Sequence, residues 1–139
     1  MSNTVTAKVV PETQRLAFLP KYFGERLMLR AESYVYSNAA LMSDDYRGGL
    51  WDFFELTNGG FYLAPVGPER FNVTVQGNGY EGEVSADGYG VIVTLFVLGS
   101  LCWMVQDEAT RDRLSDHYHQ LREFADSHAD GAAIFRAID

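Results

Sequence analysis

Apolar residues in the amino-terminal third of the chain recur with helical spacing. Residues 1–10 predict a loose start with room for a short strand. Pro11 then opens a helix that we expect Pro20 to break, because proline is tolerated in a first turn but not in a helix interior. A second helix is predicted from Glu25 to Met42. Its inner face is formed by side chains three and four residues apart, namely Leu27, Ala31, Tyr34, Val35, Asn38 and Met42.

The middle of the chain changes to the pattern of β-strands. Residues 50–56 are aromatic and extended in character, and residues 71–76 alternate apolar and polar side chains. Asn58-Gly59 between two aromatic segments is a strong hairpin signal, and Gly77-Asn78-Gly79 marks another tight turn. The pattern predicts a four-stranded antiparallel meander with strands at 50–56, 61–64, 71–76 and 80–84.

Helices return after Ser85, whose side chain suits a helix N-cap. The segment that follows contains β-branched residues and glycines, but its length of about 18 residues favours a helix to Trp103 over a strand. Further helices are predicted over 108–127 and 132–138. The sum is a single α+β domain over residues 1–139, in which the four-stranded meander packs with four to five helices.

The longest apolar run of the chain covers residues 91–105. Polar and small residues interrupt it, and at 15 residues it is shorter than the roughly 20 residues that span a bilayer. It therefore predicts a buried core helix and no association with a membrane. The first residues lack the basic and apolar regions of a secretory signal, so we expect a cytoplasmic protein.

Acidic residues outnumber basic ones by 19 to 11, which gives a net charge of −8. The excess lies in residues 44–87 and 107–139, whereas residues 1–43 carry more bases than acids. This balance argues against strong direct binding to DNA, which needs clustered Lys and Arg. Cys102 is the only cysteine, so a disulfide framework and a four-cysteine zinc site are excluded. Its place in the apolar run predicts a buried, inert thiol.

The acidity also raises the alternative of a protein that mimics DNA. A globule of this length has a diameter of about 37 Å, and duplex DNA of that length carries about 22 phosphate charges. The chain has 19 acids for all of its faces, interrupted by 11 bases. The count favours a soluble surface of ordinary acidity and leaves a weak DNA mimic as the alternative.

The sequence contains no arrangement with the spacing of an active site or a metal site. His117 and His119 point to different sides of a helix and cannot share a metal ion. Asp44-Asp45 suits a turn better than a metal site or an acid–base pair, and His128 falls in a loop. We therefore expect no catalysis, no cofactor and no metal.

Aromatic side chains are concentrated in the predicted hairpin over residues 50–62. Alternation places Trp51 and Phe53 on one face of the first strand and Phe54 on the other. If the open side of the sheet is uncovered, some of these rings form a protein-binding patch. If helices cover both sides, the rings are cross-strand pairs in the core. The sequence leaves both alternatives open.

Several segments resemble the KlcA/ArdB family of antirestriction proteins. The resemblance is carried by residues 46–65, from Tyr46-Arg47-Gly48-Gly49 to Leu63-Ala64-Pro65, and by residues 77–87 with the Thr94-Leu95-Phe96 helix after them. Residues 19–24 and the ending from Tyr118 to Asp139 also look like that family, so the resemblance covers nearly the whole chain in order. Gly88-Tyr89 stands where the family commonly has two alanines, which adds Tyr89 as a candidate exposed side chain.

The resemblance implies a protein of plasmids and other mobile elements, which lets incoming plasmid or phage DNA escape type I restriction. We expect it to contact the type I restriction–modification machinery or an associated host factor. We expect a monomeric, non-enzymatic inhibitor that acts through protein contacts. Three turn-rich segments are its candidate interaction surface, because turns expose groups that are free to bind. The candidate residues are Asp44, Arg47, Trp51, Asn58, Tyr62, Asn78, Tyr80 and Asp87.

Overall fold

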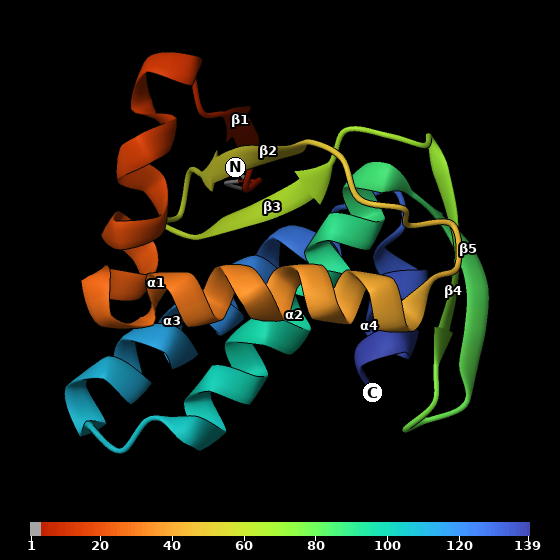
Figure 1. The fold of residues 1–139 in the computed structure, drawn as a ribbon. Helices are drawn as coiled ribbons and strands as arrows, with labels where there is room; N and C mark the ends of the chain where they lie inside the picture. Colours follow the sequence, from red (N-terminus) through yellow and green to blue (C-terminus); the bar gives the residue numbers. More distant parts are fainter. Residues whose placement is uncertain (1–3) are drawn as a thin grey trace.

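A computed structural model describes residues 4–139 of the chain (Figure 1). A short 3₁₀ turn at Glu12–Gln14 precedes the first α-helix. The elements in chain order are β1 (Ala7–Val9), α1 (Arg15–Met42), β2 (Trp51–Leu56), β3 (Phe61–Pro65), β4 (Arg70–Val75), β5 (Tyr80–Ser85), α2 (Ala86–Met104), α3 (Glu108–Asp126) and α4 (Gly131–Ile138). The α+β class is confirmed, and all four predicted strands exist.

The first helix is bent at a different residue from the one predicted. Pro20 lies inside α1 without ending it, and the helical dihedral angles fail at Gly24 instead, where φ is 79° and ψ is 158°. Proline at this position removes one hydrogen bond near the start of the helix. A positive φ changes the direction of the chain, and glycine adopts it without steric cost. The prediction of a break at Pro20 is therefore wrong, and the bend is four residues later.

The strands form two small sheets and not one meander. β1, β2 and β3 make an antiparallel three-stranded sheet, and β4 and β5 make a separate antiparallel hairpin. The predicted pairing of β3 with β4 is wrong. In Figure 1 the three-stranded sheet lies at the top and the β4–β5 hairpin stands at the right.

A hydrogen bond from outside the sheets occupies part of the edge of β4 that does not pair with β5. The backbone N–H of Asn72 in β4 donates to a carboxylate oxygen of Asp45 at 2.7 Å. Pro65 ends β3 and Pro68 lies in the link to β4, and neither has an N–H to give to a ladder. Part of β4's edge is thus satisfied by a loop, and the link is poorly suited to a continuous hairpin.

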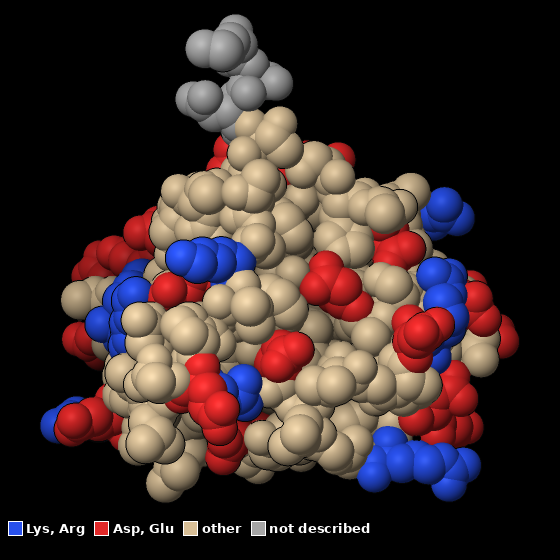
Figure 2. Space-filling model, turned by 90° about the horizontal axis from the view of Figure 1, so that it is seen from above, with Lys and Arg blue, Asp and Glu red and all other residues tan. Residues whose placement is uncertain are grey.

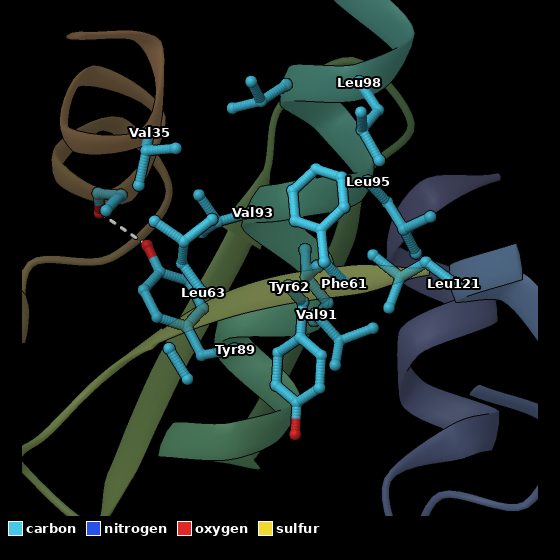
Figure 3. Packing of buried hydrophobic residues seen from close by; sticks show 14 of the residues in the cluster. Val35, Phe61, Tyr62, Leu63, Tyr89, Val91, Val93, Leu95, Leu98 and Leu121 are labelled. Atoms are coloured by element: carbon cyan, nitrogen blue, oxygen red, sulfur yellow. Dashed lines mark hydrogen bonds between the residues drawn. The ribbon is translucent and has the colours of Figure 1, made fainter. Parts of the chain in front are cut away.

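Helix α2 is the centre of the molecule and contacts α1, α3, α4 and strands of both sheets. Most of its residues from Gly88 to Leu101 are buried. Figure 3 shows side chains of α2 packed against α1, β3 and α3, and the hydroxyl of Tyr89 reaches the backbone oxygen of Ala39 in α1. Tyr89 is therefore a core residue, and its predicted exposure is wrong. By length and composition α2 could cross a membrane, but most of it is buried inside this domain, as in the core helix predicted.

Candidate functional site

The aromatic hairpin is part of the core, so the alternative of an exposed aromatic patch is wrong. Trp51 is 3% exposed and Tyr62 1% exposed. The indole N–H of Trp51 donates to the hydroxyl of Tyr46 at 3.1 Å. Tyr62 stacks between Phe54 and Phe124. Neither Trp51 nor Tyr62 presents its ring to a partner in this conformation.

Tyr62 instead begins a partly buried polar network with Asp87 and His128. Its hydroxyl donates to Oδ1 of Asp87 at 2.7 Å, and the other oxygen of Asp87 lies 2.7 Å from Nε2 of His128. Burial raises the pKa of Tyr62 well above its ordinary value, and Asp87 raises it further because a carboxylate opposes a phenolate beside it. Tyr62 is therefore a neutral donor. The network joins β3, the first turn of α2 and the connection between α3 and α4.

A second carboxylate extends the network to the end of β5. Oδ2 of Asp130 accepts hydrogen bonds from the hydroxyl of Ser85 at 2.6 Å and from its backbone N–H at 3.0 Å. Burial alone would raise the pKa of Asp130, but the two hydrogen bonds from Ser85, together with the nearby basic side chains of His128 and Arg70, outweigh it and hold the pKa below its ordinary value. Ser85 also caps α2, because its hydroxyl oxygen accepts from the N–H of Gly88, as predicted.

The hydrogen bonds fix the proton on His128. Its Nδ1 accepts from the backbone N–H of Asp130 at 2.9 Å, and this assigns the ring hydrogen to Nε2, which donates to Asp87. Both ring nitrogens are occupied, and the side chain is 8% exposed. A general base needs a free nitrogen within reach of a substrate proton. The geometry therefore makes His128 a bridge between α2 and the α3–α4 connection.

Two other candidate residues tie hairpin tips to helices. The amide of Asn58 donates to the backbone oxygen of Gln120 at 2.9 Å and to the carboxylate of Glu123 at 2.8 Å. The amide of Asn78 donates to the backbone oxygen of Ala137 at 2.8 Å. Asn58 thus binds the β2–β3 turn to α3, and Asn78 binds the β4–β5 turn to the end of α4.

The remaining candidates lie at two separate places. Asp44 and Arg47 are exposed in the loop between α1 and β2. Tyr80 is half-buried at the start of β5, and its hydroxyl lies over Gly82 of the same strand. In Figure 1 the loop of Asp44 and Arg47 runs beside the upper part of the β4–β5 hairpin, and the hairpin turn is at the bottom. The structure therefore does not assemble the eight candidates into one surface.

Residues 4–139 hold no group of three or more His, Cys, Asp or Glu side chains that could bind a metal ion. His117 is half-buried against the rings of Tyr22 and Phe61, and burial lowers its pKa. His119 is exposed. Cys102 is half-buried and not fully buried as predicted, and burial raises the pKa of its thiol.

The network around Asp87 includes two residues that the sequence did not single out for function, His128 and Asp130. Their spacing allows the backbone N–H of Asp130 to reach the ring of His128. The signal in the sequence for this contact is an Asp two residues after a His, just before a predicted helix. The partners Asp87 and Ser85 lie more than 40 residues away in sequence, and only the fold brings them near.

Comparisons with known proteins identify the family. A family model described as "Antirestriction protein" matches residues 44–139, which is more than half of the chain. The chain belongs to the antirestriction protein family. It is 50% identical over 135 residues to an antirestriction protein KlcA of Escherichia coli, covering 97% of this chain and 95% of the relative. A second KlcA of the same species is 47% identical over 139 residues, covering 99% of this chain and 95% of the relative.

A solved structure supports the same assignment for this antirestriction family member. It covers 100% of this chain and 98% of the solved chain, with a TM-score of 0.91 and 47% identity. It comes from work on KlcA and ArdB proteins, described as having a novel fold and antirestriction activity against type I DNA restriction systems in vivo but not in vitro. The resemblance to the KlcA/ArdB family is thereby confirmed.

Proposed function

We propose that this chain protects incoming DNA from type I restriction in the cell, by protein contacts and without catalysis. The observation that carries the proposal is the likeness over the full chain, at 47% identity and a TM-score of 0.91, to a protein structure described by that activity. Proteins this similar in both sequence and fold are expected to share the surface that acts. The likeness supports the antirestriction activity, and the contacts in the structure bear on how the chain acts.

The described side chains favour contact over catalysis. The best-assembled polar cluster uses both nitrogens of His128 and the hydroxyl of Ser85 internally. In that cluster no nucleophilic side chain is hydrogen-bonded to a base with a free lone pair. Hydrolytic chemistry needs such a nucleophile–base pair. The cluster stabilises the junction of β3, β5, α2 and the α3–α4 connection.

Activity in vivo but not in vitro, as described for the related structure, favours a target beyond the restriction enzyme alone. An inhibitor that occupies the DNA channel of a restriction enzyme should also work with purified components. One that needs a host factor works only where that factor is present. We therefore propose a host factor associated with type I restriction as the direct partner of this chain.

The exposed part of the α1–β2 loop is the contact surface we propose from the candidate residues. Asp44 and Arg47 are exposed there, and Leu50 at the end of the loop is 77% exposed. The neighbouring Val66, whose N–H donates to the backbone oxygen of Leu50 at 2.9 Å, is 58% exposed. Arginine is enriched at protein interfaces, and neighbouring exposed apolar side chains rimmed by polar ones are typical of a binding surface.

The distribution of charge in Figure 2 gives little support to DNA mimicry. On this face, uncharged residues fill most of the centre, with a few carboxylates among them. Lysines and arginines lie close to acids toward the rim. A duplex mimic presents continuous rows of negative charge, spaced like phosphates.

The test is the plating of unmodified phage on a host that restricts by a type I system, with and without the expressed chain. We expect the chain to raise the plating efficiency. The variant Asp44→Ala/Arg47→Ala removes two contacts of about 1 kcal/mol each, which weakens a partner's binding about 30-fold. It should lose most protection while folding normally. The matched variant Asp126→Ala/Arg136→Ala removes the same charges from exposed sites elsewhere and should protect fully.

Three outcomes would contradict parts of the proposal. Unchanged plating with soluble chain present would remove the antirestriction function. Full protection by Asp44→Ala/Arg47→Ala would remove the α1–β2 loop as the contact surface. Inhibition of a purified type I enzyme by this chain, lost steeply as salt is raised, would establish the DNA mimic in place of the host factor.

A further inference from the structure

An open groove of about 610 Å³ lies where the bend of α1 meets the turn between α2 and α3. Its apolar lining includes Phe23 and Leu27 of α1 and Met104 at the end of α2. Three arginines line it as well, Arg26 and Arg30 from α1 and Arg113 from α3. In Figure 1 the α2–α3 turn lies at the lower left, far from the α1–β2 loop at the upper right. The groove is thus a different surface from the one proposed above.

The bend at Gly24 brings these arginines together. Because the chain turns there, the part of α1 after the bend faces the start of α3 across the groove. The guanidinium of Arg113 lies over Gly24, with Nη2 3.5 Å from the place where a Cβ would stand. A larger residue at position 24 would be strained by the φ of 79°.

The three arginines form no close ion pair among residues 4–139. None of Arg26, Arg30 and Arg113 appears in an ion pair or donates a side-chain hydrogen bond within the described residues. Two acids, Glu25 and Asp107, also line the groove. Asp107 caps α3 through Thr110, so its carboxylate is already engaged. Positive charge therefore predominates in the groove of a chain whose net charge is −8.

An exposed tryptophan at the end of α2 is next in sequence to Met104 of the groove. Trp103 precedes Met104 and is 92% exposed, which is unusual for so large an apolar side chain. It lines a separate hollow with Cys102 and Arg111, and the guanidinium of Arg111 donates to the backbone oxygen of Val105 in the groove wall at 2.9 Å. Tryptophan and arginine are the residue types most enriched where protein contacts contribute most to binding energy.

We propose that this groove binds an acidic segment of a partner protein that carries an apolar side chain. The planar guanidinium groups can bind carboxylates through paired hydrogen bonds, and the apolar walls can take a side chain of the size of leucine or phenylalanine. A segment that extends past Met104 toward Arg111 would meet the exposed ring of Trp103. Nucleic acid fits less well, because its affinity comes from many phosphate contacts and the groove offers three arginines beside two acids. The inference does not depend on the antirestriction proposal.

Selection from a random peptide library displayed on phage tests this specificity directly, with the purified chain as bait. We expect enriched peptides to combine Asp or Glu with Leu, Ile, Phe or Trp. Synthetic versions of these peptides should bind at least about tenfold more weakly to Arg26→Glu/Arg30→Glu/Arg113→Glu than to the unmodified chain. The matched variant Lys8→Glu/Arg122→Glu/Arg136→Glu changes the net charge equally on exposed residues elsewhere and should bind normally.

Trp103→Ser provides a test that does not require the charge-reversed variants to fold. Because the side chain is 92% exposed, we expect an unchanged unfolding midpoint in urea and weaker binding of the same peptides. Single substitutions of Arg30 or Arg113 by glutamine give graded losses if the triple variant does not fold.

The proposal fails if the selection enriches no acidic-apolar motif, or if binding is the same for both triple variants. It also fails if a single-stranded oligonucleotide binds the chain and the groove variant loses that binding, which would make the groove a nucleic-acid site. Sedimentation tests the remaining alternative, in which a second copy of the chain fills the surface. The proposal also fails if the chain is a dimer that Trp103→Ser converts to a monomer. Phage plating separates the two proposals, since peptide binding can hold in a chain that gives no protection.

Discussion

Gly90 in α2 lies closer to a neighbouring element than any side chain would allow. A Cβ at this position would lie 2.3 Å from the backbone oxygen of Leu63 and 2.5 Å from Cα of Ala64, both in β3. Real Cβ contacts are above 3 Å. These are backbone atoms, so no side-chain rotation relieves the clash. Replacing Gly90 by alanine must therefore push α2 and β3 apart by about 1 Å.

The cost follows from what α2 and β3 share. They meet in the core, with buried residues on both sides, and overpacking of such a contact typically costs about 1–3 kcal/mol, occasionally more. Alanine in place of glycine gains about 1 kcal/mol of helix propensity. Because the clash involves backbone, we take an overpacking cost of about 3–4 kcal/mol, which leaves a net loss of about 2–3 kcal/mol.

Urea unfolding followed by circular dichroism measures this loss, and the same helix supplies the control. At Gly99 the nearest such atom is Cε2 of Tyr118 at 3.9 Å, an ordinary contact. Gly99→Ala should therefore gain about 1 kcal/mol of unfolding free energy in urea, while Gly90→Ala should lose about 2–3 kcal/mol. On heating, this loss corresponds to unfolding about 6–12 °C lower. If Gly90→Ala is as stable as the unmodified chain, the close packing of α2 on β3 is wrong.

Two predictions concern the polar network. Tyr62→Phe leaves the ring buried but removes the hydrogen bond to Asp87, which should lower the free energy of unfolding by about 1.5–3 kcal/mol; equal stability in urea would show that the contact is absent. Asp130 has a folded pKa below its ordinary value, so its carboxylate stabilises the fold above about pH 4 and this contribution is lost as the pH falls through the folded pKa. Asp130→Asn should thus be less stable at pH 7 and lose less stability on acidification, and parallel urea midpoints for both proteins from neutral to acid pH would contradict this.

The sequence predicted local structure well wherever a local signal was strong. The N-cap at Ser85 and the length of the apolar segment after it correctly gave α2. Asn58-Gly59 correctly placed the turn between β2 and β3. These signals act within a few residues and need no knowledge of the rest of the fold.

The arrangement of the strands could not be predicted in the same way. The β3–β4 link resembles a hairpin connection in length, but the N–H of Asn72 bonds to Asp45 from a distant loop. The bend of α1 was placed at Pro20 because proline is the stronger breaker in general, whereas Gly24 takes the positive φ. In both cases a tertiary contact or packing demand selects among locally allowed alternatives.

The candidate site shows why polar residues in turns are ambiguous. Such residues are free to bind a partner, but they are also the groups best able to satisfy backbone atoms of another element. Asn58 and Asn78 do the latter, by donating to backbone oxygens about 60 residues farther along the chain. The sequence alone predicts the turn but does not show which backbone carbonyl of another element lies next to it.

The same reasoning directs the search for the acting surface. Trp51, Asn58, Tyr62, Asn78 and Asp87 are all engaged in contacts within the chain. Substituting them would weaken the fold and reduce protection for that reason alone. Loss of activity at these positions therefore says little about a partner unless stability is measured on the same variant. Exposed residues that make no side-chain hydrogen bond or ion pair among residues 4–139, such as Arg47 in the loop and Trp103 at the end of α2, are the positions where a loss of protection would point to binding.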